Sequence, residues 1–509
     1  MEFLPIYDEL WAISDIHMGG EKSKAKDFQI FCRGERLGNF IRYLIRQNPQ
    51  DDVALVLDGD VIDSLAEDVV PGYTAVDLPT ITAMMKHLYE DPGFEPVWSA
   101  LHDFVHTEKR HLVIVIGNHD IELALTPVEA SIRERLAAGD AKANGRITFS
   151  THGGGFGCRV GGKRVFCTHG NEVDDWNIVD YNELGNLDNA IRAGRRIDES
   201  RWRPNAGTRM VIDLMNDVKA RFPFVDLLKP EINPVLSIVL TLDSSLVKKV
   251  SLSSSFKIIR DRVSGVLKTR NLLSAGEDVE SVETEDLTNA AMPELLGNSV
   301  MAQIRGMSVG DSEDELLVTA EVNMVTRKPA IGTTSEGATL GWSDIVAGKL
   351  GLVDRVEALR RALKDWLSRD TTFDLSDRDP TFTAIVPRVG SDVDFIITGH
   401  THLARAIEFE PGRHYFNCGT WIRLLRLTEK MLEENVFANL IYPALKAGTM
   451  EELDKPIAID ETTAPLVLDR TNAVRISKVD GVVKGSLCRI RGGENDAPIE
   501  VAEEKGIDQ

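Results

Sequence analysis

An aliphatic run that ends abruptly in polar residues is the feature that most constrains the fold of this chain. Leu112–Ile116 predicts a strand buried on both faces, as in a parallel sheet covered by helices. Gly117 ends the run, and Asn118, His119 and Asp120 follow it. Ligands of open α/β sheets bind beyond the carboxyl ends of the strands, so these three residues lie where chemistry is expected.

Four further predicted strands also end in polar residues. They are Leu10–Ser14 before Asp15 and His17, Asp52–Leu57 before Asp60 and Asp63, Lys163–Thr168 before His169, and Val393–Thr398 before His400 and His402. The amphipathic segments between the first strands predict helices, which gives a right-handed βαβαβ arrangement. The polar residues therefore gather at strand ends and are of one chemical kind.

The side chains at these strand ends are typical metal ligands. They are Asp15, His17, Asp60, Asn118, His119, His169, His400 and His402. Carboxylate oxygens, an amide oxygen and imidazole nitrogens suit divalent ions such as Mn, Fe, Zn, Co or Ni. The donors are too many for one ion and about right for two, and two ions roughly 3.5–4 Å apart can bind a phosphoryl oxygen together with a nucleophilic water.

Composition limits the class of protein. With 509 residues, the chain is expected to form two or three domains, and its formal charge of -22 disfavours a general nucleic-acid or anionic-membrane surface. The five cysteines are scattered and never in C-x-x-C spacing, which favours reduced thiols. Neither a secretory signal nor a run of about 20 apolar residues is apparent, so we expect a cytoplasmic protein without a transmembrane segment.

The motifs together resemble a known family. Asp15-x-His17, Gly59-Asp60-x-x-Asp63, Gly117-Asn118-His119-Asp120, His169-Gly170 and Gly399-His400-x-His402 resemble, in order, the five motifs of the calcineurin-like metallophosphoesterases. Asn417–Trp421 is similar to the strand and turn after the last motif. The resemblance covers about residues 8–175 and 390–425, and it implies a two-sheet α/β/β/α sandwich.

The resemblance also implies roles for single residues. Asp15, His17 and His402 would hold the first ion, Asn118, His169 and His400 the second, and Asp60 would bridge both. Manganese is the first choice for these two divalent ions, with Fe, Zn, Co and Ni as alternatives. A hydroxide between the ions would attack phosphorus, as in other two-metal centres.

Two residues are expected to assist this reaction. His119 would stabilise the transferring phosphoryl group or protonate the leaving oxygen, and Asp63 would orient His119. Asp63 has the alternative role of a helix N-cap. His169, considered alone, would be read as a hydrogen-bonded structural residue, and it is the other four motifs that favour metal binding.

The domain plan follows from the same motifs. Residues 1–175 and 390–492 are expected to form the core, 176–389 a large, mostly helical insertion that caps the site, and 493–509 a disordered tail. Within the core, 429–440 predicts a helix. The strands 473–479 and 482–488 predict a hairpin that closes the second sheet.

The insertion opens with basic residues in an otherwise acidic chain. Arg192, Arg195 and Arg196 are predicted to clamp a phosphate or nucleotide. The alternative is a solvated helix face paired with Asp198 and Glu199. Amphipathic patterns over 210–228 and 352–367, the second of them clear, support a helical insertion, and 234–259 is apolar enough for its core or for an acyl-chain pocket.

The sequence thus predicts a metal-dependent hydrolase of a phosphodiester or pyrophosphate bond in a small molecule or nucleotide. Ser64 stands where protein phosphatases of the superfamily carry a phosphate-binding arginine, which counts against a phosphoprotein substrate. The acidic run 172–176 resembles members that cleave the pyrophosphate of a UDP-diacylglucosamine, although those typically have arginine at the position of His119. The alternatives are a nuclease, disfavoured by net acidity, a phosphomonoesterase, and a metal-binding scaffold without turnover; the oligomeric state stays open.

Overall fold

A computed structural model describes most of the two predicted core segments and parts of the insertion. The described residues are 4–20, 29–67, 70, 74–75, 77–175, 177–195, 204–212, 216, 223–227, 355–367, 372–447, 449–459, 462–464, 466–479, 481–493 and 498–508. Most of the predicted cap, including the apolar segment 234–259, lies outside these residues. No helix among the described residues is long and apolar enough to cross a membrane.

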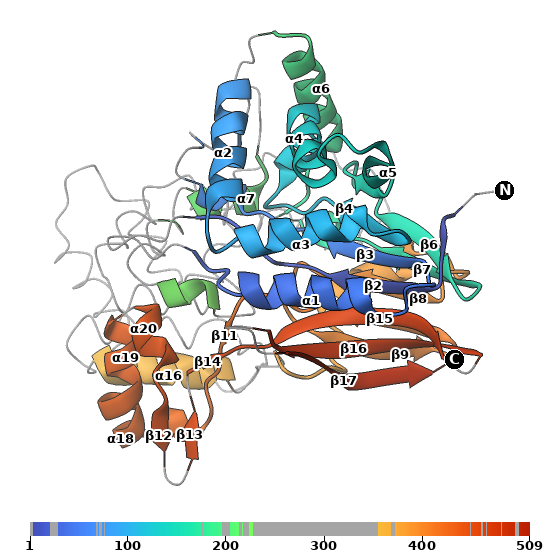
Figure 1. Cartoon of the computed structure of the whole chain (residues 1–509). Helices are drawn as coiled ribbons and strands as arrows, with labels where there is room; N and C mark the ends of the chain where they lie inside the picture. The colour runs from blue at the N-terminus through green and yellow to red at the C-terminus, as the bar shows by residue number, and fades with distance from the viewer. Residues whose placement is uncertain are drawn as a thin grey trace, which may run out of the picture.

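A seven-stranded sheet carries the predicted βαβαβ unit (Figure 1). Its strands, in spatial order, are β17 (Ile499–Asp508), β16 (Val482–Gly492), β15 (Thr471–Val479), β2 (Glu9–Ile13), β3 (Val53–Asp58), β4 (Arg110–Val115) and β5 (Ile147–Ser150). Strands β2 to β5 are parallel neighbours, and β15 to β17 extend the sheet in antiparallel order. The carboxyl ends of β2, β3 and β4 therefore share one edge.

Helices cover one face of this sheet, and a second sheet covers the other. The helices are α1 (Gly34–Arg46), α2 (Leu78–Glu90), α3 (Glu95–His106), α4 (Thr126–Ala137) and the short α5 (Ala141–Asn144). Trp11 and Ile13 belong to the buried cluster on the helix side, whereas Leu10 and Ala12 belong to the cluster between the sheets. This alternation follows from the two-residue period of a strand. Both faces are apolar, as the aliphatic runs predicted.

The second sheet has six strands and its own helical cover. The strands, in spatial order, are β1 (Ile6–Tyr7), β6 (Phe156–Val160), β7 (Lys163–Cys167), β8 (Phe395–Thr398), β10 (Arg413–Asn417) and β9 (Arg405–Glu410). Phe382 and Ile385 of α17 (Pro380–Ile385) pack with Tyr415 on its outer face. The predicted α/β/β/α sandwich is confirmed. All five cysteines are free thiols, and four of them are buried.

The C-terminal part differs from prediction in two respects. The hairpin β15–β16 was expected in the second sheet, but β15 pairs with β2 in the first, where Arg475 Nε lies 2.8 Å from Glu9 Oε1. The predicted disordered tail instead contains β17, which pairs with β16. Ile499 and Val501 pack on the helix-side core, and Glu503 lies 3.1 Å from Lys484 across the strands. The high charge of the tail obscured this two-residue alternation.

A smaller cluster forms beside the sandwich (Figure 1). It contains the 3₁₀ turn Pro223–Leu227, α16 (Arg355–Leu367), α18 (Glu434–Val436), α19 (Tyr442–Ala447), α20 (Met450–Asp454) and the short strands β11 (Leu424–Leu425), β12 (Ile457–Ile459), β13 (Thr462–Ala464) and β14 (Val467–Leu468). Leu359 and Leu363 of α16 are buried here, as the amphipathic pattern predicted. The predicted helix 429–440 is a succession of short helical turns that continues to Ala447.

Arg110, the first residue of β4, ties that strand to the end of α1. Its side chain is fully buried, and burial lowers the pKa of the guanidinium. It donates to the backbone carbonyls of Leu44, Ile45, Gln47, Asn48, Asp51 and Lys109. Since the last carbonyls of a helix have no partner within the helix, Arg110 supplies donors to carbonyls that the helix leaves unpaired.

We expect Arg110→Met to lower the free energy of unfolding by about 3 kcal/mol, because it removes six hydrogen bonds, one of them buried and the others partly buried. Arg46→Met, at an exposed position in the last turn of the same helix, is the matched control and should change it by less than about 0.5 kcal/mol. Urea denaturation measures both. Equal midpoints for the two variants would contradict this role of Arg110.

Candidate metal centre

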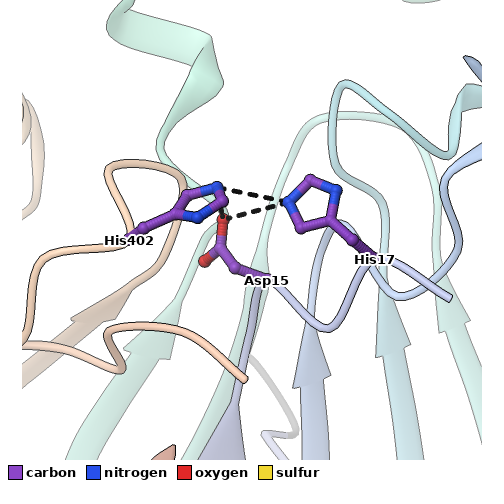
Figure 2. A group of neighbouring side chains, drawn as sticks. All are labelled: Asp15, His17 and His402. Atoms are coloured by element: carbon purple, nitrogen blue, oxygen red, sulfur yellow. Dashed lines mark hydrogen bonds and ion pairs between the residues drawn. The ribbon is translucent and has the colours of Figure 1, made fainter. Parts of the chain in front are cut away.

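Loops from distant parts of the chain meet at the carboxyl-end edge of the sheets. Asp15 and His17 follow β2, and His402 follows β8; Figure 2 shows their side chains directed toward one another. His402 Nε2 lies 3.2 Å from Asp15 Oδ1 and 3.2 Å from His17 Nε2. All three residues are buried, and one ligand atom from each lies within 4.8 Å of the others. The structure thus brings together the three residues predicted for the first ion.

Asp60 connects this group to a second one. Asp60 Oδ2 is 3.7 Å from His17 Nε2 and 3.2 Å from His169 Nε2. Asp15, Asp60 and His169 form a second group close enough to hold an ion, and His17, Asp60 and His119 form a third. Asp60 accordingly lies between His17 and His169, and its bridging role stays a prediction.

The orientation of His169 is fixed by the backbone. Its Nδ1 lies 2.7 Å from the carbonyl oxygen of Asp58, an acceptor, so Nδ1 carries the proton and donates it. This leaves Nε2 as the nitrogen with a lone pair on the Asp60 side. Metal-bound histidines commonly donate their other N–H in this way.

Asn118 and His400 lie at the edge of these groups. Asn118 is buried, and its Nδ2 is 3.5 Å from Asn177 Oδ1. His400 Nε2 is 3.0 Å from Asp174 Oδ2, and its ring centre is 5.4 Å from that of His169. With Nε2 occupied, His400 has Nδ1 left to bind an ion. Their assignment to the second ion stays a prediction.

The ligand loops adopt an unusual backbone conformation. Eight described residues other than glycine have a positive φ, and five of these are predicted ligands: Asp15, His17, Asp60, His400 and His402, with φ between 51° and 69°. Such residues cost of order 1–3 kcal/mol each and persist only where the surrounding structure enforces them. Their concentration at one edge indicates that the loops are shaped to place side chains, not for local stability.

Three glycines permit the close approach of these loops. A Cβ on Gly117 would lie 2.1 Å from Asp60 Oδ1, and one on Gly399 would lie 2.5 Å from Ser14 Oγ. Gly59 has φ +82°, and its Cβ would lie 2.3 Å from His169 Nδ1. Any side chain at these positions would push a ligand or its support aside.

His119 and Asp63 form the expected pair. His119 Nδ1 lies 3.1 Å from Asp63 Oδ1, and the backbone N–H of His119 donates to Asp60 Oδ1 at 2.9 Å. Asp63 precedes the 3₁₀ turn Ser64–Ala66, but its side chain makes no capping hydrogen bond, so the alternative N-cap role is not supported. Ser64 Oγ donates to the carbonyl of His119 at 2.9 Å and thereby holds its backbone.

Buried carboxyl groups dominate the electrostatics of this edge. Burial raises the pKa of Asp15 and of Asp58, and burial together with the charge of Asp60 raises that of Asp120 to about 7. For Asp60 and Asp63 burial acts in the same direction, but neighbouring imidazoles outweigh it and hold both pKa values below their usual range. A bound cation would offset the repulsion among these groups.

Several side-chain atoms of the predicted ligands lack the hydrogen bond that a buried polar atom normally makes. Asp15 Oδ1, Asn118 Oδ1 and His169 Nε2 are buried and make no hydrogen bond. The ion-pair contacts of Asp15 Oδ1 and His169 Nε2 are with other predicted ligands, His402 and Asp60. Buried polar atoms are seldom left unpaired, and several unpaired donors gathered in one place are typical of an ion-binding site. Since these atoms are oxygen and nitrogen donors of the predicted ligands, the residues present fit divalent metal ions.

The predicted arginine clamp is not brought to this edge by any described contact. Arg192 ends α6 (Tyr181–Arg192), is exposed, donates to Asn189 Oδ1 at 2.7 Å and pairs with Asp188 at 3.3 Å. Arg195 is exposed, and Arg196 lies outside the described residues. The exposed, paired state of Arg192 resembles the alternative of a solvated helix face, although its partners are not the predicted ones. A clamp role for the three arginines stays a prediction.

Two supporting residues were not included in the predicted site. Asp120 is fully buried and accepts hydrogen bonds from the N–H groups of Gly117, at 2.6 Å, and Val61, at 2.7 Å, which joins the loops after β3 and β4. Asp174 contacts His400. Both lie next to motifs, in Gly117–Asp120 and the acidic run 172–176, but a carboxylate beside a motif is common on a surface. The sequence therefore contained the residues but no sign of their burial or contacts.

Comparison with known proteins agrees with this geometry. Residues 9–219 match the family model described as calcineurin-like phosphoesterase. No curated protein matches the chain. The matched range contains β2 to β7 and the first four motifs, whereas His400 and His402 lie outside it.

We expect Gly117→Ala to weaken binding of Mn²⁺ at least tenfold, because the added Cβ displaces the Asp60 carboxylate. Gly185→Ala, within α6 where a Cβ meets no atom within 4 Å, is the control and should leave affinity unchanged. Competition with a fluorescent chelator measures both affinities. Unaltered Mn²⁺ binding in Gly117→Ala would show that Asp60 is not a ligand.

Proposed function

Because the chain belongs to the calcineurin-like metallophosphoesterase superfamily, we propose that it hydrolyses a phosphodiester or pyrophosphate bond of a small molecule or nucleotide at a centre of two divalent metal ions. The observation that carries the proposal is the pair of adjoining ligand groups, Asp15–His17–His402 and Asp15–Asp60–His169, which share Asp15. Membership of the superfamily and these groups together support a metal-dependent phosphoesterase.

The proposed metal ligands are the residues of these two groups, to which we add Asn118 and His400. In this assignment Asp15, His17 and His402 hold one ion, Asn118, His169 and His400 the other, and Asp60 both. Bound ions of this kind supply Lewis acidity toward a phosphoryl oxygen and make a bound water acidic. Manganese is proposed first among Mn, Fe, Zn, Co and Ni, since oxygen donors accompany the imidazoles.

His119 is the proposed catalytic residue at the leaving group. Its Nδ1 is held by Asp63 at 3.1 Å, and Nε2 is the ring nitrogen that we assign to the substrate side. Asp63 remains ionised because neighbouring imidazoles hold its pKa below the usual range, and a carboxylate at Nδ1 stabilises the protonated imidazole. His119 can then donate a proton to the departing oxygen, with Asp63 as its positioning residue.

The substrate class is inferred from what surrounds this pair. Ser64 donates to the backbone of His119, so the position that carries a phosphate-binding arginine in phosphoprotein phosphatases has a structural role here. A net charge of -22 gives little attraction for a polyanionic nucleic acid. A small phosphodiester, pyrophosphate or nucleotide is therefore proposed, and the free cysteines support a cytoplasmic location.

The first test is hydrolysis of bis-p-nitrophenyl phosphate and of p-nitrophenyl phosphate with Mn²⁺ present or chelated. We expect metal-dependent hydrolysis that favours the diester, and a fall in kcat of about 10³-fold in Asp60→Asn, since the bridging charge is lost. Asp103→Asn, at an exposed site on α3, should retain full activity. Preference for the monoester would instead indicate a phosphatase, and two bound metals without turnover of either compound would favour the scaffold.

Asp63→Asn tests the role of the pair. We expect kcat to fall about 10²-fold with little change in KM, and the alkaline limb of the kcat profile to move to lower pH, because protonated His119 loses its carboxylate partner. Bound metal should stay at the wild-type level. A profile of unchanged shape would mean that Asp63 does not act through His119.

A further inference from the structure

The strand register places Arg470 at the edge of the first sheet that carries the predicted metal ligands. It immediately precedes β15, which runs antiparallel to β2 with Val474 opposite Ala12. Thr471 pairs with Thr420, and Thr420 Oγ1 donates to the carbonyl of Asp15 at 2.9 Å. The start of β15 therefore adjoins the loop that carries the first metal ligands.

Arg470 lines a narrow pocket that His402 also lines. The pocket has a volume of about 10 Å³ and is lined by Thr372, Phe373, Leu375, His402, Ala404, Thr420, Leu424, Arg470, Asn472 and Glu504. Arg470 Cζ lies 5.1 Å from the centre of the Phe373 ring, a cation–π contact that helps to hold the guanidinium in place. A space of this size accepts about one oxygen atom.

Arg470 has no counter-ion among the residues that the structure describes. Within the described part of the chain it makes no hydrogen bond and no ion pair, and its buried Nε has no acceptor. Asn472, 4% exposed in the same pocket, also has an unpartnered amide oxygen. An amide can present either its oxygen or its nitrogen, so Asn472 can also donate here. Arg470 and Asn472 thus line the same small pocket, and each has a buried polar atom without a hydrogen-bond partner.

The neighbouring arginines are all paired, which sets Arg470 apart. Arg33 and Arg36 contact Asp469 at 2.8 and 2.9 Å, and Arg423 contacts Asp454. Arg489 donates to the carbonyl of Asp469 at 3.0 Å and lies 3.7 Å from Glu504, so the negative charge of Glu504 in the pocket has a partner.

The unpaired charge of Arg470 is also felt by Arg489. Burial lowers the pKa of Arg489, and the positive charge of Arg470 lowers it further. An anion at Arg470 would relieve this repulsion and satisfy Nε. In a chain with 80 acidic and 58 basic residues, a cation left unpaired beside a metal ligand indicates an external partner.

We propose that Arg470, assisted by Asn472, binds an anionic oxygen of the substrate outside the scissile group, namely an oxygen of the second phosphoryl group of a pyrophosphate or nucleotide. This inference rests on the proposed function and deepens it, because it names the residue that selects substrates with two linked phosphoryl groups. The contact is charge-assisted and directional, as guanidinium contacts with phosphate are.

The test is isothermal titration of inorganic pyrophosphate and of orthophosphate into the Mn²⁺-loaded protein. Arg470→Gln should weaken pyrophosphate binding at least tenfold and orthophosphate binding less than twofold. Arg470→Lys should recover part of the loss. Arg491→Gln, which removes an exposed arginine 3.8 Å from Glu500, is the control and should bind both anions as wild type does. Equal loss for both anions, or none, would overturn the inference.

Two further readouts separate the possible failures. Removing an unpaired, partly buried charge should leave the melting temperature of Arg470→Gln unchanged or raise it, whereas a lower melting temperature would mean a structural role. Hydrolysis of bis-p-nitrophenyl phosphate by the wild-type protein, measured beside the titrations, tests the proposed function separately. If the protein hydrolysed no phosphoester but its binding of pyrophosphate still depended on Arg470, the proposed function would be refuted. The inference about Arg470 would stand.

Discussion

The repulsion among buried carboxyl groups at one sheet edge is the constraint on which the rest of the site depends. Asp15, Asp58, Asp60, Asp63 and Asp120 are each at most 2% exposed. Asp58 ends β3, and the other four lie in the loops after three adjacent parallel strands. Imidazoles balance part of this charge, but several donor atoms stay unpaired. Divalent cations are the partners that suit such a set of oxygen and nitrogen donors.

The backbone conformation of these loops is consistent with their holding metal ligands in place. Left-handed conformations at five predicted ligands are unfavourable by themselves, and the motif glycines bring the loops so close that a methyl group would clash. Asp120 and Asp58 hold the arrangement together through backbone hydrogen bonds. The two-sheet sandwich supplies the rigid frame, since its strands are packed on both faces and end at the same edge.

Much of the core and of the ligand set could be predicted because they depend on local patterns. Aliphatic runs that end in a polar motif identify β2, β3, β4, β7 and β8, and with them the residues that converge. Long-range pairing has no such local sign. Strand β15 contains alternating apolar residues that suit either sheet, and the choice depends on Glu9 and on the core that Val474 and Ile476 meet.

The unforeseen features near the site follow from that pairing. Arg470 lies at the sheet edge that carries the candidate metal ligands only because β15 lies beside β2. Arg192 is closer in sequence to a motif, but it is exposed and paired within its own helix. Likewise β17 escaped prediction because its apolar residues alternate with charges that satisfy one another across the strands. Proximity to a motif in sequence was therefore a poor guide to proximity in space.

Metal content per chain is the most direct test of the central claim that this edge holds two divalent ions. Elemental analysis of protein equilibrated with Mn²⁺ and freed of excess should give two ions per chain for the wild type. His402→Ala and His169→Ala should each retain about one, because each removes a ligand of a different ion. A wild-type protein with one ion or none, or single variants that retain both, would contradict the two-metal account.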